Sequence, residues 1–461
     1  MKYQKGFPAL LASMLLIPST SVLAKVSADE ASKLGKELTC TGAIATGNED
    51  GTIPAFSGKW LGKPDHVEYE PHIGQPLVDP YKDDQPLYVI DGSNFNQYAD
   101  KLTPGQMAMF KQYPDSFKMP IYPGRRDFRY PDAVCLTMKK NAVESELIDD
   151  GFGFTGYKGA VPFPIPDLNQ PMQVFANQNF PYRPYTYSTV RDVADVSSSG
   201  SIAWARTLNE GLNVTTHPDE VGKPIDGVMA YSFVSSILPT RKEGNATVTS
   251  EPVNFKRGKR LAWTYNPGTR RVRQLPEYGF DTPLTGTSGK LTLDSDRLMN
   301  GSPERYEWKA FERREMFIPA NAYRVHQDDV SYDALLTKNH ANPDFMRYEL
   351  RRVWVLEGQL KDEYRHKYGR RVMFIDEDTW HAVAGDFYDT RGELVQYAYI
   401  NYYYAFDAQS YEAGSSFYHD LKSGGYVGYN LFQERGAAPV LNKGNYTANN
   451  FTPAALRRLS H

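Results

Sequence analysis

Two clusters of neighbouring carboxylates come closest, by type and spacing, to residues that could do catalytic chemistry. They are Asp376-Glu377-Asp378 and Asp328-Asp329. Paired carboxylates supply the general acid and base of many hydrolases. Runs of acids also stand at the solvated ends of hairpins, which is the commoner situation for charged side chains. The sequence leaves both interpretations open and favours the second.

A basic hairpin offers a different chemistry, the binding of an anion. Residues 266–269 (Asn-Pro-Gly-Thr) predict a turn between two short strands. Strand alternation places Trp263 and Tyr265 on one face of the first strand, and Arg271 and Arg273 on one face of the second. Two such arginines beside an aromatic face could hold an anionic head group above an apolar cavity. The alternative is that they are surface arginines paired with acids of the next strand.

Tryptophans recur from residue 204 onward, at 204, 263, 308, 354 and 380. Large aromatic side chains belong first of all to the core, and they would form a ligand wall only if the sheet curls around an unfilled space. On that hypothesis the candidate ligand-binding residues are Trp263, Tyr265, Arg271, Arg273, Trp354 and Trp380.

The usual signatures of cofactor, metal and nucleophile sites do not fit this sequence. The nine histidines have no metal-binding spacing, no Gly-Lys dipeptide is followed by Ser or Thr, and no Gly-x-Ser-x-Gly occurs. Residues 151–156 (Gly-Phe-Gly-Phe-Thr-Gly) match a dinucleotide-binding fingerprint in letters, but the following residues, through Pro162, cannot begin the helix that would receive a pyrophosphate. We therefore expect no cofactor, no metal site and no catalytic residue, and hence a protein that is not an enzyme.

Charge and composition exclude further classes. The chain has 52 Lys and Arg against 55 Asp and Glu, a net charge of −3, and without Lys2 and Lys5 of the leader it becomes 50 − 55 = −5. Such a balance does not favour nucleic acid as a partner. The 61 aromatic residues (6 Trp, 32 Tyr and 23 Phe), with 31 Pro and 36 Gly, favour a β-rich body with long loops.

Residues 1–24 have the three parts of a secretory signal peptide. Lys2 and Lys5 give a positively charged N-terminal region, residues 7–17 form the apolar region, and Val22-Leu23-Ala24 has the residue pattern of a cleavage site. The apolar stretch is shorter than the roughly 20 residues needed to span a bilayer, and no later stretch approaches that length. We expect an exported, periplasmic protein, mature from about Lys25 and without a transmembrane segment, with peripheral association to the outer membrane as a further option.

Export gives the two cysteines a role. In an oxidising compartment Cys40 and Cys135 could form a disulfide, which would close a loop of 135 − 40 + 1 = 96 residues. Two buried thiols are the alternative.

The chain divides into two segments of different character. Residues 25–170 contain helix signals and Pro- and Gly-rich connectors, which predict arms that wrap another body: capping patterns at Ser27 and Thr103, and a helix over 132–141. Residues 171–461 contain short runs of Val, Tyr, Trp and Thr between turns, typical of an antiparallel sheet. Strands are expected over 185–193, 201–207, 229–235, 260–265, 270–274, 306–311, 348–356, 371–375, 381–388 and 394–403. The expected fold is a β-dominated α+β protein, with a strongly curved antiparallel sheet or half-open barrel of about ten strands, covering helices and long N-terminal arms, packed as one unit.

Several ordered strings carry a resemblance to a known family. They are Leu38-Thr39, Gly42-Ala43, Gly47 to Ala55 (Gly-Asn-Glu-Asp-Gly-Thr-Ile-Pro-Ala), Tyr98 to Gln106 (Tyr-Ala-Asp-Lys-Leu-Thr-Pro-Gly-Gln), Tyr122-Pro123-Gly124-Arg125-Arg126, Gly156-Tyr157, Val161 to Pro166, Pro267 to Arg273, Asn300-Gly301-Ser302-Pro303, Arg305-Tyr306, Arg347-Tyr348-Glu349, Arg352-Val353-Trp354-Val355 and Asp376 to Trp380. In these strings the chain resembles the domain-of-unknown-function family 1329, whose members are often labelled outer-membrane lipoprotein-sorting proteins.

The resemblance implies a fold similar to that of the periplasmic lipoprotein carriers, in which a half-open antiparallel barrel covered by helices holds acyl chains. It also implies work beside a resistance-nodulation-division type exporter and an outer-membrane partner. It supplies no catalytic or ligand residue, and fold alone does not establish cargo.

Three functions remain, in order of preference. The first is a periplasmic carrier for a lipid, a lipoprotein acyl chain or another hydrophobic compound. The second is a structural adaptor of an envelope transport complex that carries no cargo. The third is an exported lipid-acting hydrolase, which would need two acids within about 10 Å in one cleft.

Overall fold

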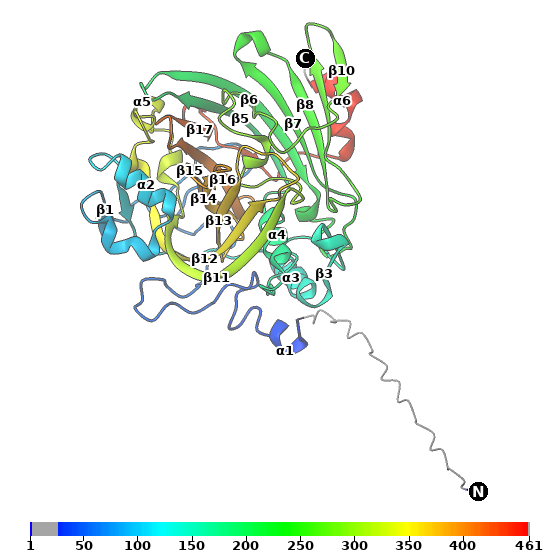
Figure 1. The fold of residues 1–461 in the computed structure, drawn as a ribbon. Coiled ribbons are helices and arrows are strands. Elements are labelled where there is room, and N and C mark those ends of the chain that lie inside the picture. The colour runs from blue at the N-terminus through cyan, green and yellow to red at the C-terminus, as the bar shows by residue number, and fades with distance from the viewer. Residues whose placement is uncertain (2–25, 460–461) are drawn as a thin grey trace.

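The computed structural model describes Met1 and residues 26–459, so the predicted signal peptide, residues 1–24, lies outside the described residues apart from Met1. One strongly curved sheet of sixteen strands dominates the fold (Figure 1), and β3 and β4 form a separate hairpin. The strands are β1 (Tyr88–Ile90), β2 (Met119–Ile121), β3 (Glu146–Ile148), β4 (Gly153–Thr155), β5 (Thr186–Val196), β6 (Ile202–Asn213), β7 (Val228–Leu238), β8 (Ala246–Pro252), β9 (Leu261–Asn266), β10 (Arg271–Gln274), β11 (Tyr306–Pro319), β12 (Tyr348–Leu360), β13 (Arg370–Asp376), β14 (Ala382–Tyr388), β15 (Leu394–Ala405), β16 (Ser410–Asp420), β17 (Tyr426–Leu431) and β18 (Val440–Leu441).

Short helices cover this sheet. They are α1 (Ala28–Ala31), α2 (Pro104–Gln112), α3 (Asp132–Glu144), α4 (Pro171–Asn179), α5 (Tyr332–Leu335) and α6 (Pro453–Leu459). The expected fold class, a β-dominated protein with a strongly curved antiparallel sheet and covering helices, is confirmed. The sheet has sixteen strands instead of about ten.

The sheet does not close into a barrel. Its order is β1-β2-β12-β13-β14-β15-β16-β17-β5-β6-β7-β8-β9-β10, with β11 paired to β12 and β18 paired to β5. In the part of the chain that the structure describes, β10 pairs only with β9 and β11 only with β12. These two strands are consecutive in the sequence but stand at opposite edges, and residues 275–305 connect them. We call these residues the bridging loop.

The N-terminal helices begin where their capping residues predict. Thr103 accepts a hydrogen bond from the Gln106 backbone N–H at 3.0 Å, and the Gln106 side chain accepts one from the Thr103 N–H at 2.9 Å. This reciprocal capping box starts α2. Ser27 accepts from the Glu30 N–H at 3.1 Å and starts α1. Strands β1 and β2 of the same N-terminal region join the sheet beside β12. The N-terminal segment, residues 25–170, therefore contributes to the sheet itself.

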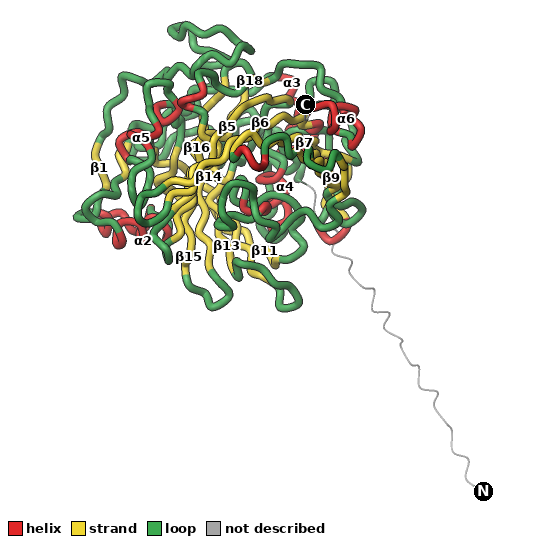
Figure 2. Tube along the Cα trace, turned by 90° about the horizontal axis from the view of Figure 1, so that it is seen from above, coloured by secondary structure: helices red, strands yellow, loops and turns green. Residues whose placement is uncertain are grey.

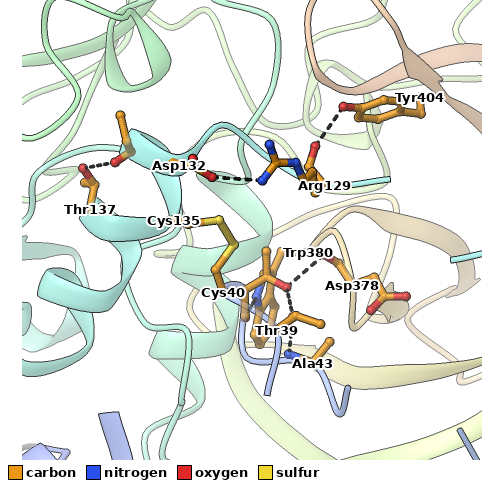
Figure 3. The surroundings of a disulfide bond; sticks show 12 residues. Thr39, Cys40, Ala43, Arg129, Asp132, Cys135, Thr137, Asp378, Trp380 and Tyr404 are labelled. Carbon is orange, nitrogen blue, oxygen red and sulfur yellow. Dashed lines mark hydrogen bonds and ion pairs between the residues drawn. A yellow bond between two sulfur atoms is a disulfide. The ribbon is translucent and has the colours of Figure 1, made fainter. Parts of the chain in front are cut away.

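Cys40 and Cys135 form a disulfide in the structure, with their Cα atoms 5.1 Å apart. Figure 3 shows this bond beside Trp380. The Trp380 indole N–H donates to the backbone carbonyl of Thr41 at 2.8 Å, so the turn before β14 also holds this stretch of chain. The disulfide therefore joins the N-terminal arm to α3, and the arm in turn contacts the sheet.

Candidate functional site

A cavity of about 560 Å³ lies within the curve of the sheet. Its wall comes from β5 to β10, from the C-terminal end of α4 and from the bridging loop. Figure 2 shows α4 and neighbouring loops between β7 and β13, on the inner side of the strands. Ligand-binding cavities commonly enclose about 300–1,000 Å³, so this one has the volume of a ligand site.

The inner face of β7 to β9 is largely polar because large apolar side chains of these strands point the other way. On the outer face, Phe233, Val248 and Tyr265 pack with Phe451 and Leu456 of the C-terminal segment. Alternation then leaves the polar residues of the same strands on the cavity side. Together with those of β6, these inner residues include Thr207, Asn209, Ser232, Ser236, Thr247, Thr249 and Thr264.

Basic side chains are in excess on the cavity wall. Seven cationic residues line it, against two carboxylates, in a chain whose net charge is −3. The cations are Arg183, Arg191, Lys242, Arg260, Arg271, Arg273 and Arg297, and the acids are Glu251 and Asp296. Arg260 forms a salt bridge with Glu251, which neutralises one pair. The remaining excess makes this cavity an attractive environment for an anion.

An apolar strip completes the wall. Val193 of β5 and Val234 of β7 contribute to it, with Leu284, Leu293 and Met299 of the bridging loop. The cavity can therefore contact both a polar group and a short length of hydrocarbon.

The arginines beside α4 shift the pKa values of one another and of neighbouring buried groups. Burial, and then the charge of Arg297, lower the pKa of Arg183 to about 10. Burial raises the pKa of Glu412 on β16, although Arg297, Arg191 and Arg183 oppose that rise. Burial, Arg183 and Arg297 also lower the pKa of His381 well below its usual value, so this imidazole is neutral.

The candidate residues from the sequence divide into three groups. Arg271 and Arg273 line the cavity, and Tyr265 borders it while packing in the outer cluster. Trp263 packs in that outer cluster and is not part of the cavity wall. The reason is the hairpin register, which pairs Arg273 with Thr264, so the arginine face and the Trp263 face are opposite sides of the sheet.

Trp354 and Trp380 also lie away from the cavity wall, which contains no tryptophan. Their rings stack on each other with centroids 5.6 Å apart, and both side chains are buried. The Arg313 guanidinium lies 4.3 Å from the centre of the Trp354 ring. The predicted ligand wall of Trp354 and Trp380 is therefore not part of this cavity: these two rings hold the N-terminal arm against the sheet, and tyrosines are the aromatic residues that line the cavity.

The cluster Asp376-Glu377-Asp378 is buried, and its favoured interpretation as a solvated hairpin end is wrong. Arg126 pairs with Asp378 at 2.7 Å, and Arg351 approaches Asp376 at 3.2 Å and Asp378 at 2.8 Å. Burial alone would raise the pKa of Asp378, but Arg126 and Arg351 outweigh it and hold this pKa below its usual value.

Glu377 completes the cluster. It pairs with Arg313 at 3.1 Å and with Arg352 at 3.4 Å. Burial, and then the charge of Asp378, raise the pKa of Glu377 to about 7. All three acids are thus engaged by arginines in a buried ionic network. The other cluster, Asp328-Asp329, is exposed at the surface, where Asp329 pairs with Arg324.

Sequence reasoning missed Arg183, Arg191 and Arg297. Arg191 alternates with Thr189 and Val193 in β5, which places it on the inner face, but this strand contains no other sign of a site. Arg183 and Arg297 stand in connecting segments whose path the sequence does not predict. The available signal was the alternation of polar and apolar residues along two strands. Ser232 precedes Phe233 in β7 and Thr249 follows Val248 in β8, which indicates one hydrophilic face.

Within residues 26–459, no helix combines the length and the apolar character needed to cross a bilayer. The same residues bring together no group of three or more His, Cys, Asp or Glu side chains that could hold a metal ion.

Fold and site together define a class: an open, strongly curved β-sheet protein that encloses a basic cavity. Residues 89–457 match the model of the family described as "Protein of unknown function (DUF1329)". The chain is also 37% identical over 448 residues to the uncharacterized protein PA3922 of Pseudomonas aeruginosa, covering 96% of each chain. This protein therefore belongs to the DUF1329 family, which confirms the resemblance seen in its motifs.

Two solved structures are similar to part of the chain. One is a putative outer membrane lipoprotein-sorting protein domain from Vibrio parahaemolyticus, with 16% identity and a TM-score of 0.40, covering 59% of this chain and 91% of that one. The other is a DUF1329 family protein from Desulfovibrio piger, with 14% identity and a TM-score of 0.38, covering 59% of this chain and 90% of that one.

The strings that carried the family resemblance meet in the buried ionic network. Arg126 ends Tyr-Pro-Gly-Arg-Arg, Arg352 begins Arg-Val-Trp-Val, and Asp378 stands within Asp-Glu-Asp-Thr-Trp. Arg126 and Asp378 are in direct contact, and Arg352 contacts Glu377. These strings therefore encode the junction between the N-terminal arm and the sheet. The string Pro267 to Arg273 lies elsewhere and supplies two cavity arginines.

Proposed function

We propose that this protein is a periplasmic binding or carrier protein for an amphiphile, which it holds in the cavity within the curved sheet. The candidate ligands are a lipid, a lipoprotein acyl chain or another hydrophobic compound with a polar end. One observation carries the proposal: a 560 Å³ cavity whose wall combines an excess of cations, many hydroxyl and amide groups, and an apolar strip.

The physical reason for a carrier is the cost of exposing hydrocarbon to water, about 0.8 kcal/mol for each methylene group. Val193, Val234 and Leu284 offer apolar contact for the part of the tail nearest the head group. The polar inner face changes the hypothesis drawn from the sequence: the head group, and not only the tail, is placed inside the protein.

The leader sequence, the family resemblance and the net charge support a compartment and a set of partners. The predicted signal peptide supports a periplasmic location, and peripheral association with the outer membrane is a further option within this proposal. The family resemblance supports a resistance-nodulation-division type exporter and an outer-membrane protein as partners, and the net charge of −3 supports no role for nucleic acid. No catalytic step belongs to this proposal, because the acids that could have formed a hydrolytic pair are held by Arg126, Arg351 and Arg313.

Native mass spectrometry of the protein purified from its own periplasm, with organic extraction of the same sample, tests this function. We expect a bound amphiphile. The substitution Ser232→Trp fills the cavity from β7 and should abolish the bound mass, whereas Ser199→Trp, at an exposed turn, should retain it. Ligand-free protein from the periplasm that also fails to take up any added lipid would favour the cargo-free adaptor.

A further inference from the structure

Three arginines from three separate segments meet at the end of the cavity beside α4. Arg183 follows α4, Arg191 stands on β5 and Arg297 belongs to the bridging loop, and all three line the cavity. They also share one electrostatic neighbour, because each of them opposes the rise in the pKa of Glu412 that burial causes. We call these three residues the arginine cluster.

The arginine cluster lacks the carboxylate partners that other enclosed arginines of this chain have. Arg126, Arg347 and Arg371 approach Asp378, Glu349 and Asp294 at 2.7, 2.9 and 2.8 Å. Among the described residues, no carboxylate forms a salt bridge within 4.0 Å with any member of the cluster. Arg183 donates instead to the backbone carbonyl of Asn179, at 2.9 Å. The three arginines are half-buried, and, against the effect of burial, Asp296 and Glu412 raise the pKa of Arg297 without forming a salt bridge with it. Two carboxylates thus partly balance three guanidinium groups, and the remaining positive charge favours an anion at the cavity wall.

Buried polar atoms without partners surround the same end of the cavity. Gln178 and Asn179, at the end of α4, are 4% and 6% exposed, and His381 before β14 is 5% exposed. Gln178 Oε1, Asn179 Nδ2 and His381 Nε2 make no hydrogen bond within the described protein, and neither does Arg191 Nε. All four residues line the cavity. Buried polar atoms in folded proteins are usually hydrogen-bonded, so unpartnered ones call for a ligand or ordered water.

The bridging loop holds Arg297 by a strained backbone. Arg297 and Leu298 both have left-handed φ angles, +52° and +69°, which residues with a side chain rarely adopt. The loop is anchored just before them, because Asp294 pairs with Arg371 at 2.8 Å and with His366 at 3.1 Å. A strained backbone of this kind persists where the surrounding structure holds the residue in place. Here the anchored loop holds the Arg297 guanidinium at the cavity wall.

We propose that the arginine cluster is an oxyanion site for a phosphate ester in the head group of the ligand, with Asn179 and Gln178 binding hydroxyl groups next to that phosphate. This assignment rests on the proposed function and names the chemistry of its ligand. Guanidinium groups bind phosphate oxygens through paired, charge-assisted hydrogen bonds, and three of them can surround one phosphate. The neutral His381 adds a hydrogen bond without adding charge.

Isothermal titration of the mature protein with four probes tests the site and its source. The probes are dioctanoyl phosphatidate, dioctanoylglycerol, glycerol 3-phosphate and inorganic phosphate. We expect phosphatidate to bind at least about tenfold more tightly than dioctanoylglycerol, which has the same tails without the phosphate. Its affinity should also fall as salt rises, whereas that of dioctanoylglycerol should not.

Substitutions locate the binding. Arg297→Gln and Arg183→Gln should each weaken phosphatidate about tenfold or more and leave dioctanoylglycerol unchanged. The control Arg365→Gln, at an exposed position, should change neither. The ligand-free Arg183→Gln variant should melt no lower than the wild type, since it loses a cation that Arg297 repels.

The pattern of binding shows whether the oxyanion site fails alone or together with the carrier function. Equal binding of phosphatidate and dioctanoylglycerol, with no salt dependence, overturns the oxyanion site and leaves the carrier function standing. Inorganic phosphate binding as tightly as phosphatidate, with the same loss in Arg297→Gln, supports the site and identifies free phosphate as its source. Binding of none of the four probes overturns the site and counts against the carrier function. The salt dependence is measured on the wild type, so the result does not depend on how the variants fold.

Discussion

Arg126 donates two hydrogen bonds to the carboxylate of Asp378, from Nε at 2.8 Å and from Nη2 at 2.7 Å. The two residues are 252 positions apart in the sequence, and both side chains are almost fully buried. This pair joins the end of a Pro- and Gly-rich arm to the turn between β13 and β14. A planar guanidinium facing a carboxylate in this way fixes orientation as well as distance.

Removing one partner should therefore destabilise the junction strongly. Arg126→Met leaves Asp378 buried beside Asp376 with one compensating arginine fewer, and we expect the free energy of unfolding to fall by about 3–5 kcal/mol. Urea denaturation followed by tryptophan fluorescence measures it. Arg391→Met breaks an exposed pair and should cost less than about 1 kcal/mol. A loss as small as this in Arg126→Met would mean that the arm is held by other contacts.

A buried carboxylate on β14 should make stability depend on pH. Asp386 is fully buried, and burial raises its pKa from 3.8 to about 7, although the Gly105 N–H donates to it at 3.1 Å. Between these two values only the folded protein binds the proton, so stability falls as pH rises from about 4 to 7 and is level above that. Asp386→Asn should remove this loss and exceed the wild type at pH 8 by on the order of 3 kcal/mol.

Thermal unfolding of both proteins at pH 5 and pH 8 checks the Asp386 prediction. The difference between them should grow with pH, and the exposed substitution Asp328→Asn should show no such growth. A pH-independent difference would place the titrating group elsewhere.

The disulfide should stabilise the fold by restricting the unfolded chain. Cys40 and Cys135 are 95 positions apart, and closing a loop of this size contributes about 4–5 kcal/mol in the chain-entropy model. Cys40→Ser and the double variant with Cys135→Ser should lose similar amounts, because either change opens the loop. Free-thiol counting by mass spectrometry of the unreduced mature protein gives an independent reading, and two free thiols would contradict the bond.

The two faces of the β9–β10 hairpin should respond differently to substitution. Trp263 packs in the outer cluster with the C-terminal segment, so Trp263→Ala should lower the free energy of unfolding by about 2 kcal/mol or more and leave ligand content unchanged. Arg271 is exposed on the cavity side, so Arg271→Ala should reduce retained ligand with little change in melting temperature. Ligand loss in Trp263→Ala at temperatures well below its melting point would reverse this assignment.

Local signals predicted the elements well where side chains act on their own neighbours. The capping residues Ser27 and Thr103 place α1 and α2, and the Asn266–Thr269 turn places the β9–β10 hairpin. Two of the strands that sequence reasoning missed, β8 and β16, are rich in Thr, Ser or Gly. Their pairing partners stabilise them, and such residues indicate turns when they are considered alone.

The candidate site was harder to predict because it depends on which face of each strand is covered. Alternation correctly grouped Trp263 with Tyr265 and Arg271 with Arg273, but the register of the hairpin decides that these pairs lie on opposite faces. The covering element, α6, is about 180 residues further along the chain, so no local pattern could assign the apolar face to the outside. The burial of Asp378 has a similar origin, because Arg126, which donates two hydrogen bonds to it, comes from the distant arm.

Strands β10 and β11 are consecutive in the sequence, yet they belong to different edges of the sheet. No backbone hydrogen bonds pair β10 with β11 in the part of the chain described. A movement of one strand relative to the other would therefore break no strand pairing. The bridging loop connects these two strands and places Arg297 on the cavity wall, while Asp294 of the same loop forms a salt bridge with Arg371. On the proposed function, the segment that joins these two edge strands is also the one that presents Arg297 to the ligand.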